Sequence, residues 1–150
     1  MISYRTITQS TLLAMAVTLG GCGWLSSMTG SDAMSMKNQL SGAQEVPPVT
    51  TGGSGTGETT FDKSTNVLTW TVTYSGLSGP VTAGHFHGPA MPGANAGVVV
   101  PFTGNLSSPI QGKATLTAAQ AADLTAGRWY INLHTAKHPG GEIGGQVAAK

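Results

Sequence analysis

The sequence predicts an all-β domain: an antiparallel Greek-key β-sandwich or barrel of about seven or eight strands with one short helix. Two observations predict this class. Short apolar segments recur at intervals of about ten residues between residues 39 and 150, and glycine, proline and asparagine punctuate the gaps between them. The glycines are also dispersed, so no strand, glycine-rich loop and helix follow one another as in a nucleotide-binding α/β unit.

The amino-terminal residues predict an export signal. Arg5 is the only charged side chain near a weakly apolar run from Ile7 to Leu19, and this run is too short to span a membrane. The next residues, Gly20-Gly21-Cys22, complete a pattern that resembles the bacterial lipobox, in which a cysteine after small residues is lipidated. We therefore expect residues 1–21 to be a lipoprotein signal peptide and Cys22 to carry the lipid.

Lipidation of Cys22 would fix both the location and the redox chemistry of the chain. Cys22 is the only cysteine, so no internal disulfide is expected in the oxidising envelope. Residues 22–38, rich in Ser, Gly, Met and Thr, predict a flexible tether to a domain over residues 39–150. We expect a membrane-anchored lipoprotein of the bacterial cell envelope. Gly23 after the cysteine favours the outer membrane, and the inner membrane stays open.

Eight segments carry a strand signal. The clearest is residues 67–74, where Leu68, Trp70, Val72 and Tyr74 alternate with threonines, as in a half-buried strand. The other expected strands cover residues 39–46, 56–61, 81–87, 97–102, 110–116, 128–135 and 142–148.

The single expected helix covers Thr117–Leu124. Thr117 and Gln120 have capping-box spacing, and Gly127 follows just past the end of the segment. Such a helix has about two turns, and we expect it to cover one end of the sheets.

Composition excludes a nucleic-acid-binding protein. Only 9% of the residues are charged and the formal net charge is +1; without residues 1–21 the basic and acidic side chains balance. No basic stripe is available for a phosphate backbone. A protein partner in the envelope remains open.

All four histidines lie in two short glycine-framed motifs, Gly84–Pro89 and Asn132–Glu142. Side chains alternate along a strand, so His85 and His87 share one face and lie about 6.5 Å apart, close enough for both imidazoles to reach one metal ion. If the apolar residues of both strands pack the core, His134 lies outside the core on the same side as His85 and His87.

We expect His85, His87 and His134 to bind a metal ion, with His138 or Glu142 completing the set. His138 follows the strand in a loop that can return its imidazole, and Glu142 is either a ligand or the acceptor that orients one. Imidazole sites without thiolate suit zinc or copper, and the affinity order favours copper(II). Metal binding should weaken below a pH of about 6.5, where free histidine is protonated.

Two other interpretations stay open. The histidines can be structural groups that bond to backbone in glycine-rich turns, in a noncatalytic interaction domain. The protein can also be a metalloenzyme. However, no serine or cysteine stands in a recognisable nucleophile motif, and the six acidic residues are too scattered in the sequence to form a carboxylate pair. Glu45 is expected to be a solvated charge at the end of the first strand.

The order and spacing of several motifs resemble the CHRD domain, a family named after chordin that also occurs in exported bacterial proteins. The motifs are Leu40–Pro48, Val81–Ala90, Asp123-Leu124 with Gly127, Tyr130–Thr135, and His138–Ile143 with Gly145-Gln146. The resemblance implies a shared domain without a settled activity in bacteria. At Gly144, the family pattern commonly has an arginine.

A weaker resemblance is to copper/zinc superoxide dismutase, a Greek-key β-sandwich in which a His-x-His strand supplies copper ligands. This sequence lacks that enzyme's zinc-binding loop and its disulfide cysteines. The likeness therefore implies at most a mononuclear copper or zinc site.

Overall fold

Eight antiparallel strands form a nearly closed barrel with one short helix in the computed structural model, which describes residues 32–149. The expected signal peptide, Cys22 and the first part of the expected tether lie outside the described residues. The elements are β1 (Ala33–Ser41), the 3-10 turn η1 (Gly42–Gln44), β2 (Ser54–Asp62), β3 (Val67–Ser75), β4 (Val81–His87), β5 (Val98–Pro101), β6 (Ile110–Thr115), α1 (Ala118–Thr125), β7 (Trp129–Thr135) and β8 (Ile143–Val147).

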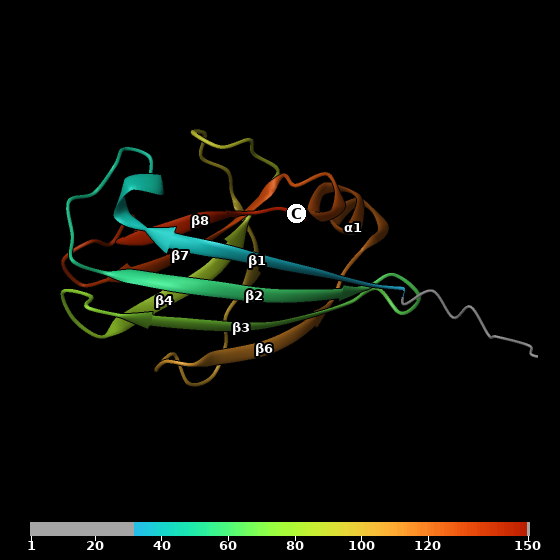
Figure 1. Ribbon diagram of the computed structural model, residues 1–150, viewed down its shortest axis with the longest axis horizontal. Helices are drawn as coiled ribbons and strands as arrows, with labels where there is room; N and C mark the ends of the chain where they lie inside the picture. The colour runs from blue at the N-terminus through green and yellow to red at the C-terminus, as the bar shows by residue number, and fades with distance from the viewer. Residues whose placement is uncertain (1–31, 150) are drawn as a thin grey trace, which may run out of the picture.

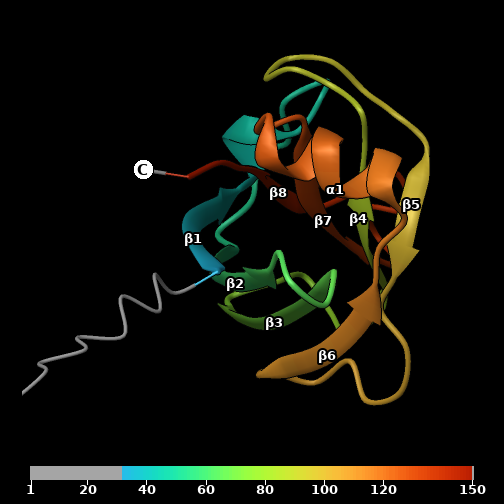
Figure 2. The same ribbon diagram turned by 90° about the vertical axis from the view of Figure 1, so that its right-hand side faces the viewer.

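The strands form one sheet in the order β5-β4-β7-β8-β1-β2-β3-β6. Figures 1 and 2 show this sheet curled on itself, and in Figure 2 its edge strands β5 and β6 lie on the same side of the barrel. The pairing of β3 with β6 and of β4 with β7 makes the chain cross over between non-consecutive strands, as in Greek-key folds. The predicted all-β antiparallel class is confirmed.

The core fills the barrel and follows the two-residue period of the strands. Trp70, Phe86 and Phe102 form an aromatic group within it: the ring centroid of Trp70 is 5.3 Å from that of each phenylalanine. Such offset and edge-to-face aromatic contacts add to the free energy gained from burial. The alternate side chains of the same strands are left on the outer surface of the barrel, where the histidine motifs lie.

The first strand differs from the prediction. It covers Ala33–Ser41 instead of residues 39–46, so residues 33–38, which we expected in the tether, pair with β2 along their whole length. Met36 is buried and the Lys37 ammonium bonds the Glu58 carboxylate at 2.6 Å. A run of Met, Ser, Lys and Asn carries little strand propensity, and only the pairing with β2 determines its conformation.

The helix is confirmed with its cap. The Gln120 amide donates to Thr117 Oγ1 at 3.2 Å and the Thr117 amide donates to Gln120 Oε1 at 2.9 Å, which forms the capping box. Leu124 is fully buried, and Gly127 takes the left-handed conformation just after the helix. Figure 2 shows α1 over one end of the barrel. Within residues 32–149, no helix is both long and apolar enough to cross a membrane.

Candidate metal centre

The two histidine motifs lie on neighbouring strands. β4 pairs with β7 so that His85 is opposite Asn132 and His87 is opposite Tyr130, while His134 is opposite Ala83. All three histidines are half-buried on the outer face. The predicted strand parity therefore places them on a common side.

The glycines that frame the first motif are explained by the core. Gly84, Phe86 and Gly88 occupy the inward positions of the segment, and the Phe86 ring is fully buried there. A Cβ atom at Gly84 would lie 2.6 Å from the Phe102 ring, and one at Gly88 would lie 2.5 Å from the Trp129 ring. Both glycines thus let large aromatic side chains approach β4 from inside, while the histidines project outward.

The three imidazoles converge. One ligand nitrogen from each of His85, His87 and His134 lies within 4.8 Å of the other two. His85 Nδ1 and His134 Nε2 are 3.1 Å apart, and the ring centroids of His85 and His87 are 5.3 Å apart with nearly perpendicular planes. This cluster provides three nitrogen donors for one ion.

Backbone carbonyls determine which nitrogen two of the rings present. His134 Nδ1 donates to the Pro139 carbonyl at 2.9 Å, and His87 Nδ1 donates to the Ala96 carbonyl at 3.0 Å. Each ring then keeps a lone pair on Nε2. A backbone acceptor on the second ring nitrogen is the usual way in which proteins orient a ligand histidine.

His87 Nε2 is the unusual atom of the cluster. It is buried and has no hydrogen-bond partner among the described residues. The His87 ring is held by Tyr130, which stacks on it with centroids 4.9 Å apart and planes 8° from parallel. A buried lone pair without a donor costs free energy, and a metal ion at this position would remove that cost.

The environment of two of these rings favours their neutral form. Burial lowers the pKa of His85, and the neighbouring His134 and His87 imidazoles lower it further. Burial also lowers the pKa of His87 and outweighs the opposing effect of its hydrogen bond to the Ala96 carbonyl. Because a metal ion binds the neutral form of imidazole, both pKa shifts extend to lower pH the range in which these two rings could bind an ion.

His138 and Glu142, which we expected to complete the ligand set, do not belong to the cluster in the described region. His138 lies in the turn after β7, where its backbone bonds Thr135 in both directions, and it is the Pro139 carbonyl of this turn that reaches His134. The turn therefore orients the His134 ring and adds no side chain to the cluster.

Glu142 lies on the side of Thr135, away from the face that carries His134. It is fully buried and accepts hydrogen bonds from the hydroxyls of Thr51, Ser78 and Thr135, each at 2.6 Å, and from the Ser78 amide at 2.8 Å. Burial raises the pKa of Glu142, but these hydrogen bonds lower it more strongly, to about 2. The carboxylate thus holds three loops together at one end of the barrel.

Glu45 differs from the prediction of a solvated charge. It is 8% exposed, and its Oε2 accepts a 2.7 Å hydrogen bond from Asn132 Nδ2. Burial raises the pKa of Glu45 to about 7, against the lowering effect of the Asn132 bond. The segment after β1 folds over β7 and β8, which the isolated sequence of this segment does not reveal.

Fold and site together define a class: an antiparallel β-barrel domain with a cluster of three histidines on its outer face. The sequence pattern of the CHRD domain matches residues 36–147, and the chain belongs to this family. Neither a curated protein nor a solved structure showed a significant match.

Proposed function

We propose that this domain binds a divalent transition-metal ion, copper(II) in preference to zinc, through His85, His87 and His134. The observation that carries the proposal is the convergence of three nitrogen donors with one buried lone pair, on His87 Nε2, that has no partner in the described part of the chain. Structural histidines would be expected to have both ring nitrogens satisfied or solvated.

The spacing of the donors supports this proposal. Two nitrogens bound at about 2.0 to 2.1 Å lie about 3.3 to 3.4 Å apart on a tetrahedral ion such as zinc, and about 2.8 to 3.0 Å apart at neighbouring positions of a square-planar ion such as copper(II). His85 Nδ1 and His134 Nε2 are 3.1 Å apart, so they need to move by only a few tenths of an ångström to share an ion. In the absence of metal these two atoms form a hydrogen bond, in which His134 Nε2 is the acceptor because His134 Nδ1 donates to the Pro139 carbonyl.

The donor set favours copper. Three imidazoles without thiolate suit both copper(II) and zinc, and at a nitrogen site of given geometry copper(II) binds more tightly. The cluster contains no carboxylate among the described residues, so the charge of the ion stays uncompensated and an anion or water is expected in the remaining position. Storage, delivery or sensing of the metal would fit such a site.

A metalloenzyme is the second candidate, and the number of ligands favours it. Three protein ligands leave a coordination position open, which is the arrangement of catalytic zinc sites. If this position takes part in chemistry, azide should bind the copper form and change its absorption or electron paramagnetic resonance spectrum. A spectrum unaffected by azide would leave metal binding as the function.

The metal-binding test compares the native protein with a His85→Ala, His134→Ala double variant in titrations with copper(II) and zinc(II). A protein for this experiment should begin no later than residue 32, because β1 starts at Ala33. We expect one ion per native chain, tighter binding of copper than of zinc, and no specific binding by the double variant. Equal binding by both proteins would reject the metal site.

The cellular location that we propose rests on the sequence alone. The lipobox-like residues that end at Cys22 support a lipoprotein anchored in the bacterial envelope. Replacement Cys22→Ser should move the protein from the membrane fraction to the soluble fraction, measured by fractionation and immunoblotting. Continued retention of this variant in membranes would contradict a lipid anchor at Cys22.

A further inference from the structure

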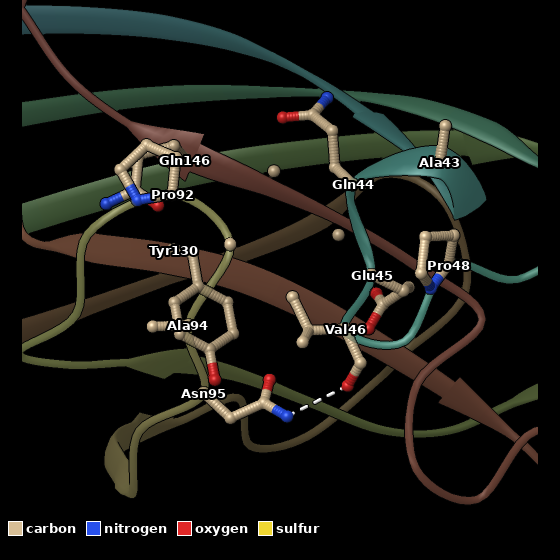
Figure 3. A pocket seen from close by; sticks show the side chains of 13 residues that line it. Ala43, Gln44, Glu45, Val46, Pro48, Pro92, Ala94, Asn95, Tyr130 and Gln146 are labelled. Carbon is tan, nitrogen blue, oxygen red and sulfur yellow. Dashed lines mark hydrogen bonds between the residues drawn. The ribbon is translucent and has the colours of Figure 1, made fainter.

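A cavity of about 410 Å³ lies on the outer surface of the barrel. The segment 43–48 after β1 forms one side and the loop 92–95 forms the other, while Tyr130 of β7 and residues 144–146 of β8 form the floor (Figure 3). Asn95 Nδ2 donates to the Val46 carbonyl at 2.8 Å, drawn dashed in Figure 3, and so connects the two sides. Sites for small molecules typically have volumes of about 300 to 1,000 Å³, so the cavity is large enough to hold one.

The cavity offers no charge to a ligand. Among the described residues that line it, none is Lys, Arg, His or Asp, and Glu45 is the one acidic residue. The Glu45 carboxyl group is buried: Oε2 bonds Asn132, and Oε1 lies within 2.5 Å of the place that a Cβ atom on Gly144 would take. A phosphate, a carboxylate or an ammonium group would therefore find no counter-ion, and because an unpaired charge is costly to bury, the ligand should be uncharged.

Three amide side chains line the cavity, those of Gln44, Asn95 and Gln146. In each of them the amide nitrogen donates to backbone carbonyls at 2.8 or 2.9 Å. Because a carbonyl can only accept, these bonds determine which end of each amide is the oxygen. The three oxygens have no hydrogen-bond partner among the described residues. Gln44 and Asn95 are exposed, and Gln146 Oε1 is not one of the buried atoms without a partner, so all three can accept a hydrogen bond from a ligand.

Tyr130 gives the cavity an aromatic surface. Its position is fixed, because its hydroxyl accepts the Ala96 amide at 3.0 Å and its ring stacks on His87 with centroids 4.9 Å apart. Since His87 does not line the cavity, the part of the ring that faces the cavity is the part that His87 leaves uncovered. Such a fixed ring binds a ligand without losing side-chain freedom, and its electron-rich face attracts partly positive C–H groups.

We propose that this cavity binds a neutral pyranose sugar. A pyranose ring combines an apolar C–H face, which would pack on Tyr130, with hydroxyl groups around its edge, which would donate to the amide oxygens of Gln44, Asn95 and Gln146. The proposal is independent of metal binding, since none of the three clustered histidines lines the cavity.

The test uses the methyl glycosides of glucose, galactose, mannose and N-acetylglucosamine as probes, with binding to the full-length protein followed by amide NMR shifts. At the affinity per atom that is usual for small ligands, a glycoside of about 13 non-hydrogen atoms should bind with a dissociation constant of about 1 mM. We expect at least one of the four to bind at this level and to shift the amides of Ala94 and Gly145. Sorbitol is the control: it has the hydroxyl groups of a sugar but no rigid C–H face, and it should bind much more weakly.

A double variant, Gln44→Ala with Asn95→Ala, tests the amide oxygens. Both residues are exposed, so the core should stay intact, and the loss of two hydrogen bonds should weaken glycoside binding about tenfold. Replacement Gln111→Ala removes an exposed amide on β6, outside the cavity, and should leave binding unchanged.

Three results would each overturn the proposal. The first is that none of the four glycosides shifts the Ala94 and Gly145 amides. The second is that sorbitol binds as tightly as the best glycoside, which would exclude packing on the Tyr130 ring. The third is equal affinity of the native protein and the double variant, which would exclude recognition by the amide oxygens.

Discussion

His87 and His138 show how position determines the role of one residue type. His87 lies on β4, where the Ala96 carbonyl and the Tyr130 ring fix its orientation and leave Nε2 buried without a partner among the described residues. His138 lies in a turn and contributes backbone hydrogen bonds. The two histidines are thus a matched pair for a substitution experiment.

Replacement His87→Ala should lower the affinity for copper(II) by about 100-fold or more, because loss of a ligand costs at least as much as loss of the partner that orients one. Replacement His138→Ala should change the affinity by less than about threefold. The dissociation constants come from competition with a chelator of known affinity. A larger effect of His138→Ala than of His87→Ala would assign the ligands differently from the cluster described above.

Among the elements, β4 and α1 were the most predictable, since each depends on local pattern. β4 covers the predicted residues 81–87, and α1 has the predicted cap. The alternation of Gly84, Phe86 and Gly88 with His85 and His87 determines which side chains face the core. The capping box at Thr117 determines where the helix begins.

Replacement Thr117→Ala should destabilise the domain by about 1 kcal/mol, because it leaves the Gln120 amide without its acceptor. Thr125 provides the control on the same helix: its hydroxyl bonds only carbonyls that helical amides already use, so Thr125→Ala should change stability by less than about 0.5 kcal/mol. Urea denaturation of both variants measures the difference. Equal effects would show that the cap is not a determinant of stability.

At the scale of the whole molecule, the sequence predicted the features that depend on the two-residue period of the strands. It did not predict the features that depend on contacts between distant segments. Strand parity correctly placed His85, His87 and His134 on one side of the barrel. Three features require a partner far away in the chain, which no local pattern encodes. These are the start of β1, the burial of Glu45 and the hydrogen bonds to the Glu142 carboxylate. Glu142 was expected to be a metal ligand or the acceptor that orients one, because its motif contains histidines, whereas its partners come from two loops and from the end of β7.

Through these partners Glu142 acts as a clamp: its carboxylate connects chain segments that lie at one end of the barrel. Thr51 lies between β1 and β2, Ser78 between β3 and β4, and Thr135 at the end of β7, and all three donate to one carboxylate. Because Thr135 and Glu142 stand at the two ends of the β7–β8 connection, three connections between strands meet at a single ionised group. Loss of its charge should loosen them together.

The effect of pH on stability follows from the pKa of this group. Because the folded pKa of Glu142 is about 2 and its usual value is 4.5, the carboxylate stabilises the fold fully above pH 4.5, and this contribution disappears as the pH falls from 4.5 towards 2. The shift corresponds to roughly 3 kcal/mol at neutral pH. Replacement Glu142→Gln should remove a similar amount at pH 7, and the native and variant proteins should become closer in stability as the pH falls.

The measurement is urea denaturation of the native, Glu142→Gln and Glu58→Gln proteins between pH 7 and pH 2.5. Glu58 is the matched control because its carboxylate is exposed and bonds a single lysine, so its replacement should change stability by less than about 1 kcal/mol. If Glu142→Gln instead abolished copper binding while leaving stability unchanged, Glu142 would act at the metal centre and not as a clamp. The hydrogen bonds from Thr51, Ser78 and Thr135 engage both of its oxygens, which is why we expect the opposite.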